Sequence, residues 1–303
     1  MFFFKEFKNN SFIIFCILIY SVLLISGFNL HLNPDFIFSG TSFDIRLLVM
    51  FLIAEPHFAM TIPLLYGYKK NFTIKPSLYI LGPLIILVFG SLMFFYMNSL
   101  FMLLFLVANI FHVNRQSGGF LMIQGKPPFS IKFLYEISLH LFTFLCLYLS
   151  IFMQYHSLTL GLMVFISTIS IMLIIFKIRN NFWPTFKQSI VMAQGYLIFL
   201  PLIVFSDMLL AFAIGISIHY FQYLSIGWRV CKIGFGYSFF TILIIILSYS
   251  ALSSAALSGF LTTERVSIFI LIPTMVQLLH FYYDSLIWRR GDPVIGNALA
   301  KAL

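Results

Sequence analysis

Long runs of apolar residues, separated by short polar breaks, follow one another along almost the whole chain. An α-helix needs about 20 apolar residues to cross the hydrocarbon core of a bilayer, and most of the runs reach that length. The pattern predicts helices over residues 11–29, 45–67, 77–97, 99–115, 132–153, 157–177, 189–206, 208–227, 236–257 and 266–288. The expected fold class is therefore all-α, a polytopic transmembrane helix bundle of about ten spans. We expect a single integral membrane domain over residues 1–303.

The composition supports lipid as the solvent of this chain. Of its 303 residues, 61% are hydrophobic and only 9% are charged, whereas a soluble domain averages about 25% charged residues. The cysteines are scattered through apolar runs at positions 16, 146 and 231. This spacing indicates neither a disulfide framework nor a zinc ribbon.

The basic residues give the predicted spans an orientation. If the predicted loops are numbered from the N-terminus, only Arg46 and Arg265 of the 18 lysines and arginines fall on the second side. The positive-inside rule then predicts that both termini are cytoplasmic. The net charge of +9 follows from this loop bias, so it does not indicate a nucleic-acid partner.

Four histidines lie inside the apolar runs, at His57, His112, His219 and His280. An ionisable residue within a membrane helix is costly and marks a candidate functional site. Four imidazoles from separate helices would make a nitrogen-rich metal site, and we expect these residues to be its ligands. His140 is a fifth candidate ligand. The alternative for each is a hydrogen bond across a helix interface.

Polar neighbours accompany these histidines at helical spacing. Tyr223 is four residues after His219, and Asp284 is four residues after His280, so each pair shares a helix face. A metal-bound histidine usually donates its second ring N–H to a carboxylate, a carbonyl or water. Glu55 precedes His57 by two residues. We expect Glu55, Tyr223 and Asp284 to be the catalytic or supporting groups.

At these residues the sequence distantly resembles the bacterial membrane β-carotene central-cleavage dioxygenases, the Brp/Blh family. Pro56-His57 is similar to the early Pro-His of that family, and Phe111-His112 follows at a similar interval. His219 is similar to the first histidine of the third motif, and His280 with Asp284 is similar to the last motif. The resemblance covers about residues 54–290.

The resemblance implies a non-haem Fe2+ site with O2 as co-substrate and a carotenoid or another polyene as substrate. It also implies a multi-pass protein of the bacterial inner membrane. Two positions depart from the family pattern: Phe58 replaces a glycine, and Tyr223 stands where a second histidine of the third motif is expected. The substrate and the fourth ligand are therefore the least determined parts of this expectation.

The sequence lacks the motifs of several other classes of enzyme. The chain has seven histidines and no clustered HxxxH or HxxHH motifs, which disfavours a di-iron desaturase. It has neither HExxH nor GxSxG, which argues against a zinc protease of that type and a serine hydrolase. A transporter or a haem-binding electron carrier remains the alternative. The expected partners are membrane lipid and a hydrophobic small-molecule or lipid substrate, and the sequence predicts no oligomeric state.

Overall fold

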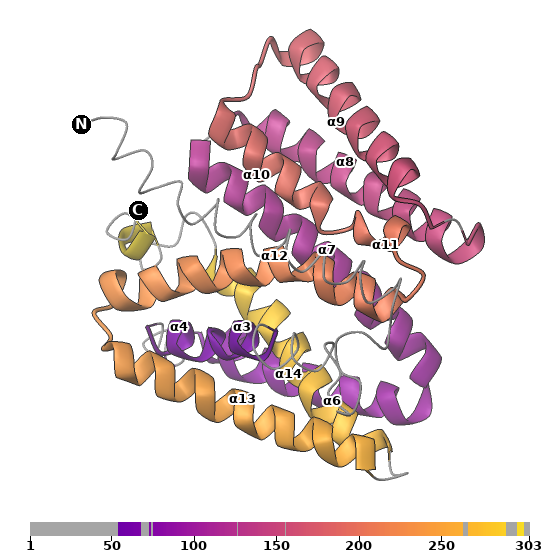
Figure 1. Ribbon diagram of the computed structural model, residues 1–303. Helices are drawn as coiled ribbons and strands as arrows, with labels where there is room; N and C mark the ends of the chain where they lie inside the picture. The colour runs from indigo at the N-terminus through magenta and orange to yellow at the C-terminus, as the bar shows by residue number, and fades with distance from the viewer. Residues whose placement is uncertain are drawn as a thin grey trace. The chain divides into compact units, whose positions relative to one another are not determined.

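The computed structural model describes residues 54–67, 73, 75–125, 127–154, 156–262, 266–288 and 296–299. In this part of the chain the fold is all-α, with eleven α-helices and three short π-helical segments (Figure 1). The all-α expectation is confirmed. The expected span over 11–29 and residues 45–53 of the next expected span lie outside the described residues.

The chain divides into two compact units. One unit comprises Met1–Val49 and Ile110–His219, and the other comprises Met50–Asn109 and Tyr220–Leu303. Both divisions within the described chain fall inside a helix, because α7 spans Asn98–Gly125 and α12 spans Met208–Arg229. The single domain expected over residues 1–303 stays a prediction.

The unit that contains Ile110–His219 is built around α8. Its remaining elements are the C-terminal part of α7, the π-helix η3 and the helices α9, α10 and α11, together with the first part of α12. Their bounds are α8 Phe129–Leu147, η3 Tyr148–Phe152, α9 Leu158–Asn180, α10 Phe186–Leu197 and α11 Pro201–Val204. Helix α8 packs against α9, α10 and α11.

Two fully buried tyrosines, Tyr135 and Tyr196, join these helices. Their ring centroids are 5.8 Å apart in an edge-to-face arrangement, which is a favoured geometry for aromatic pairs. The Tyr135 hydroxyl donates to the backbone carbonyl oxygen of Met192 at 3.0 Å. The Tyr196 hydroxyl donates to the Met172 sulfur at 2.8 Å. Each buried hydroxyl therefore has a partner.

The other unit contains the helices that carry His57 and His280. Its elements are α3 Glu55–Ala59, α4 Thr61–Gly67, η2 Ser77–Leu81, α6 Gly82–Tyr96, η4 Val230–Gly234, α13 Phe239–Thr262 and α14 Val266–Ile287. Parts of α7 and α12 complete it. Helix α3 packs against α13 and α14, and α14 packs against α6.

Helix α14 is fastened to the start of the α6 segment by two adjacent tyrosines. The Tyr282 hydroxyl donates to the backbone oxygen of Leu78 at 2.7 Å, and the Tyr283 hydroxyl donates to that of Tyr79 at 3.1 Å. Both acceptors lie in η2, where the widened π turn departs from the usual α-helical ladder. These bonds fix the rotation of α14 about its axis.

Several expected helices differ from the observed ones in their boundaries. The described part of 45–67 forms α3 and α4, which are separated by a turn at Met60. The expected 189–206 helix is divided into α10 and α11 by a turn over 198–200, just before Pro201. The expected 99–115 helix continues as α7 to Gly125, so Gly118 and Gly119 lie within a helix instead of a loop.

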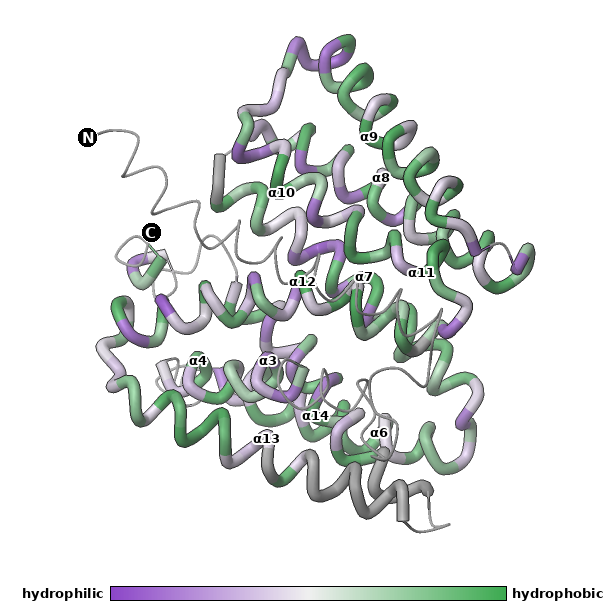
Figure 2. The backbone as a smooth tube through the Cα atoms, viewed as in Figure 1, coloured by the Kyte–Doolittle hydropathy of each residue, from purple (hydrophilic) through white to green (hydrophobic). Residues whose placement is uncertain are grey.

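Four helical stretches in the described residues are long and apolar enough to span a membrane. They are Ser77–Tyr96, Phe129–Phe152, Leu158–Asn180 and Leu210–Gly234. Their positions agree with four of the expected spans. Helix α9 is green along most of its length in Figure 2, and its central residues are largely exposed. An apolar and exposed helix of this length is typical of lipid contact.

Candidate metal centre

His57 and His280 lie next to each other in the unit that contains α3 and α14. Their side chains are buried, with 0% and 2% relative exposure. The ring centroids are 4.5 Å apart, and one nitrogen of each ring lies within 4.8 Å of the other. Two imidazoles from helices far apart in the sequence therefore converge, as the sequence pattern predicts.

Aromatic side chains surround His57. The rings of Tyr220 and Tyr223, both on α12, have centroids 4.5 Å and 4.3 Å from that of His57. The ring centroid of Phe58 lies 5.2 Å from that of His57 and 5.2 Å from that of His280. These rings exclude bulk water, and the direct contact of the two histidines leaves no space for a porphyrin between them.

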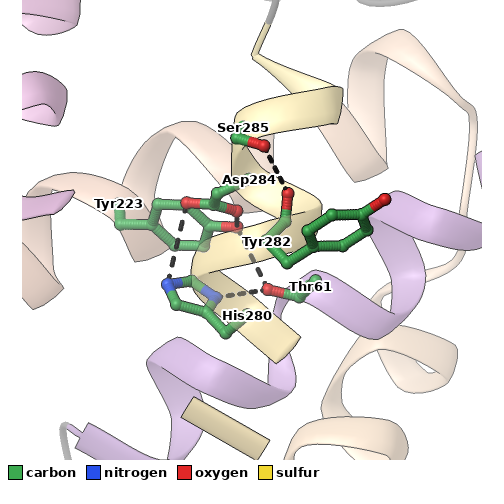
Figure 3. Close-up of polar contacts among 6 residues, drawn as sticks. All are labelled: Thr61, Tyr223, His280, Tyr282, Asp284 and Ser285. Carbon is green, nitrogen blue, oxygen red and sulfur yellow. Dashed lines mark hydrogen bonds and ion pairs between the residues drawn. The ribbon is translucent and has the colours of Figure 1, made fainter. Parts of the chain in front are cut away.

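Three hydrogen bonds join His280, Thr61, Tyr223 and Asp284 in a chain, and a longer polar contact brings Asp284 back to His280 (Figure 3). Nδ1 of His280 is 2.6 Å from Oγ1 of Thr61, and this oxygen is 3.3 Å from the hydroxyl of Tyr223. The Tyr223 hydroxyl donates to Oδ1 of Asp284 at 2.6 Å. The second oxygen of Asp284, Oδ2, is 3.6 Å from Nε2 of His280.

The directions of these bonds determine which nitrogen of His280 carries the proton. Tyr223 has one hydroxyl proton, and that proton is used in the bond to Asp284. Thr61 must then donate to Tyr223, which leaves its oxygen as the acceptor of the His280 bond. Nδ1 of His280 is therefore the donor. In this tautomer of the neutral ring, Nε2 carries the lone pair with which an imidazole binds a metal ion.

Asp284 adds a carboxylate to the same place. Two ligands of one tetrahedral metal ion, each about 2.1 Å from it, lie about 3.4 Å apart. The observed 3.6 Å between Nε2 of His280 and Oδ2 of Asp284 is close to that separation. A lone pair facing a carboxylate is also unfavourable unless a cation lies between them. His57 and His280 thus provide two imidazoles, and the carboxylate of Asp284 lies beside the second of them.

The other unit contains a second pair of histidines. His112 on α7 and His219 on α12 are both buried. Their ring centroids are 5.7 Å apart in an edge-to-face arrangement. His112 and His219 thus form a buried pair of imidazoles within this unit.

The remaining candidates lie in different surroundings. His140 on α8 donates from Nδ1 to the backbone oxygen of Glu136 at 2.7 Å, and its ring is 5.9 Å from that of Phe111. The carboxylate of Glu55 lies beside Tyr249 and Ser253 of α13. Neither His140 nor Glu55 is among the described residues that could hold a metal ion. The metal-binding role predicted for His140 and the catalytic or supporting role predicted for Glu55 stay predictions.

Thr61 and Tyr220 belong to this centre but were not predicted from the sequence. Thr61 follows His57 by four residues, which is the spacing of one helix face, and it contacts His280. Tyr220 directly follows His219 in the sequence, but its ring packs on His57. The spacing could have indicated Thr61, whereas the tertiary contact of Tyr220 has no local pattern.

Comparisons with known proteins give the chain no relative from which a function could be taken. No protein-family model, no curated protein and no solved structure matches it.

Proposed function

We propose that the protein is a membrane-embedded, non-haem iron oxygenase that acts on a lipid-soluble substrate. His57 and His280 would be its core ligands, and Asp284 would supply a carboxylate beside His280. The ten-span topology and the location in a bacterial inner membrane belong to the same proposal, as does the distant likeness to the Brp/Blh family.

The observation that carries the proposal is the chain of hydrogen bonds from His280 through Thr61 and Tyr223 to Asp284. We infer that it favours the tautomer in which Nε2 of His280 is unprotonated, near His57 and 3.6 Å from a carboxylate oxygen. Two histidines and one carboxylate with open positions are the ligand set of non-haem Fe(II) oxygenases. The support from Thr61 matches the usual need of a metal-bound imidazole for a hydrogen-bond acceptor on its other nitrogen.

The reaction class is the addition of O2 across a carbon–carbon double bond. Cleavage of that bond gives two carbonyl groups and uses both oxygen atoms, so atoms and electrons balance without an external reductant. The buried aromatic side chains would exclude water and keep an apolar substrate close to the ligands. A bound Fe2+ would supply the activation of oxygen, and the substrate class would be a carotenoid or another polyene.

The experiment is a metal analysis of detergent-purified, full-length protein by mass spectrometry, with an absorption spectrum of the same sample. We expect about one non-haem iron per chain and no Soret band. The H57A and H280A variants should lose the iron. H156A is the matched control, because His156 lies in the loop before α9.

The same samples are then tested for O2 uptake with polyenes in detergent. Iron-loaded wild-type protein should consume O2 and form carbonyl products, whereas H57A and H280A should not. Full iron retention in both variants would overturn the metal centre. A Soret band in the wild-type spectrum would instead support the haem alternative.

A further inference from the structure

Two cations share one carboxylate in the unit that is built around α8. Glu136 of α8 is buried. Its Oε1 atom lies 2.6 Å from Nζ of Lys132, and its Oε2 atom lies 3.8 Å from Nη1 of Arg115 on α7. Two positive charges and one negative charge leave this group with a net charge of +1. The group as a whole therefore attracts an anion.

A glycine makes room for the shared carboxylate beside α7. A Cβ atom at Gly118 would overlap Oε1 of Glu136 and crowd the rest of its carboxyl group. At the next residue, Gly119, a Cβ atom would meet nothing within 4 Å. The position of the carboxylate between its two cations therefore depends on the close approach of α7 at Gly118.

Arg115 keeps hydrogen-bond donors for a ligand. Its side chain is 57% exposed, and its contact with Glu136 at 3.8 Å is longer than a hydrogen bond. A guanidinium carries several N–H donors in a planar fork that fits a phosphate group with two parallel hydrogen bonds. The ammonium of Lys132 has donors beyond the one that faces Glu136. Together the two cations supply the donors that a phosphate group requires.

Exposed phenylalanine rings lie beside both cations. The guanidinium carbon of Arg115 is 5.9 Å from the ring centroid of Phe111, and Nζ of Lys132 is 5.9 Å from that of Phe129. These two rings are 55% and 73% exposed. Lys132 is also in the first turn of α8, where the candidate membrane span Phe129–Phe152 begins. Cationic donors at the end of a span, next to exposed apolar rings, match a ligand with an anionic head and an apolar tail.

We propose that Arg115 and Lys132 bind the phosphate group of an anionic phospholipid, for which phosphatidylglycerol is the test lipid. The exposed rings of Phe111 and Phe129 would contact its acyl chains. This site rests on the membrane location proposed above, but it does not depend on the metal centre.

The charge of the neighbouring helix agrees with an anionic ligand. The last turn of α9 carries Lys177 and Arg179, both of them exposed. This turn adjoins the start of α8, because the Ser130 hydroxyl donates to Oδ1 of Asn180 at 3.0 Å. Cations so placed attract a negatively charged lipid without contacting it. A lipid with a net negative charge is therefore favoured over a zwitterionic one.

The test counts lipid molecules on full-length protein in a neutral detergent by native mass spectrometry. The wild type should bind phosphatidylglycerol more tightly than phosphatidylcholine with the same acyl chains. R115Q leaves the pair of Lys132 and Glu136 intact and should weaken the binding of phosphatidylglycerol by roughly 10-fold, because charge-assisted hydrogen bonds are lost. The iron content of R115Q should equal that of the wild type, so this result and that for the metal centre are separate. Equal binding of the two lipids to the wild type would overturn the proposal. Displacement of the lipid by soluble glycerol phosphate would overturn it in favour of a soluble anion.

Matched variants separate the site from the overall charge. R179Q removes the same charge from the exposed end of α9 and should leave the affinity for phosphatidylglycerol close to that of the wild type. G118A keeps every charge but displaces the carboxylate of Glu136, so it should weaken binding, whereas G119A should not. Wild-type affinity in R115Q would overturn the proposal. Equal weakening in R115Q and R179Q would also overturn it, because the lipid would then respond only to the overall charge.

Discussion

Thr61 has a specific role in the candidate centre, because its hydroxyl accepts the hydrogen bond of His280 and donates one to Tyr223. T61V keeps the volume of the side chain but removes both bonds. Loss of such a supporting partner typically lowers metal affinity by roughly 10- to 100-fold. We expect a decrease of that size, measured by competition with a chelator on purified protein.

The serine substitution at the same position separates hydrogen bonding from packing. T61S keeps the hydroxyl and should retain near wild-type metal affinity, whereas Y223F should weaken binding because it interrupts the same chain of hydrogen bonds at the next bond. T168V on α9 is the control, because the Thr168 hydroxyl donates to the backbone oxygen of Val164 in its own helix. Equal affinities in T61V and T61S would show that the bond to His280 has no effect on the metal.

The residues of the centre were predictable to different degrees. His57 and His280 stand out in the sequence because a charged or polar ring inside an apolar helix is costly. Asp284 was predictable from its spacing to His280. The position of Glu55 was not, because the direction of its side chain depends on the turn at Met60 and on the packing of α3 against α13.

At the scale of elements, the close approach of α12 to the end of α10 depends on a residue without a side chain. A Cβ atom at Gly215 would overlap the backbone oxygen of Ile198, and a backbone atom cannot move aside as a side chain can. We expect G215A to lower the free energy of unfolding by about 1–3 kcal/mol. The measurement is the midpoint of thermal unfolding in detergent.

The control for this substitution is another glycine within a helix. A Cβ atom at Gly119 of α7 would meet nothing within 4 Å. G119A should therefore leave stability unchanged or raise it slightly, because alanine favours the helical backbone. If G119A destabilises the protein as much as G215A does, the effect of G215A does not arise from the contact with Ile198.

The boundaries of the elements follow local chemistry that a hydropathy pattern does not detect. Thr185 caps α10 in a capping box with Gln188, which places the start of the helix before the apolar run. At the other end, a turn and Pro201 divide the same run into two helices. Hydrophobic runs predict that helices exist, but caps, turns and packing decide where they begin and end.

At the scale of the whole molecule, α9 tests the membrane topology most directly. Its 23 residues extend over about 34 Å, enough for a bilayer core of about 30 Å. In a cysteine-free background, Q154C and W183C flank this helix. We expect an impermeant maleimide to label Q154C from outside and W183C only from the cytoplasmic side, where Lys177 and Arg179 lie next to it.

Labelling of both positions from the same side would contradict α9 as a span. Labelling from opposite sides but in the reverse order would keep the span and overturn the orientation. Sequence hydropathy was sufficient to predict the all-α class and four of the helices that are long and apolar enough to span a membrane. It could not predict the division into two units, since both boundaries lie within continuous helices.

The tyrosines that fasten α14 to η2 have a consequence for metal selectivity. The turn that carries His280 and Asp284 is held by Tyr282 and Tyr283 on one side and by Thr61 on the other. Copper outcompetes iron at a flexible nitrogen site because the site can relax to the tetragonal geometry that copper prefers. A turn held at several points cannot relax in this way without losing hydrogen bonds. In a centre built on α14, the protein scaffold would therefore discriminate between ions by rigidity, through residues that are not ligands themselves.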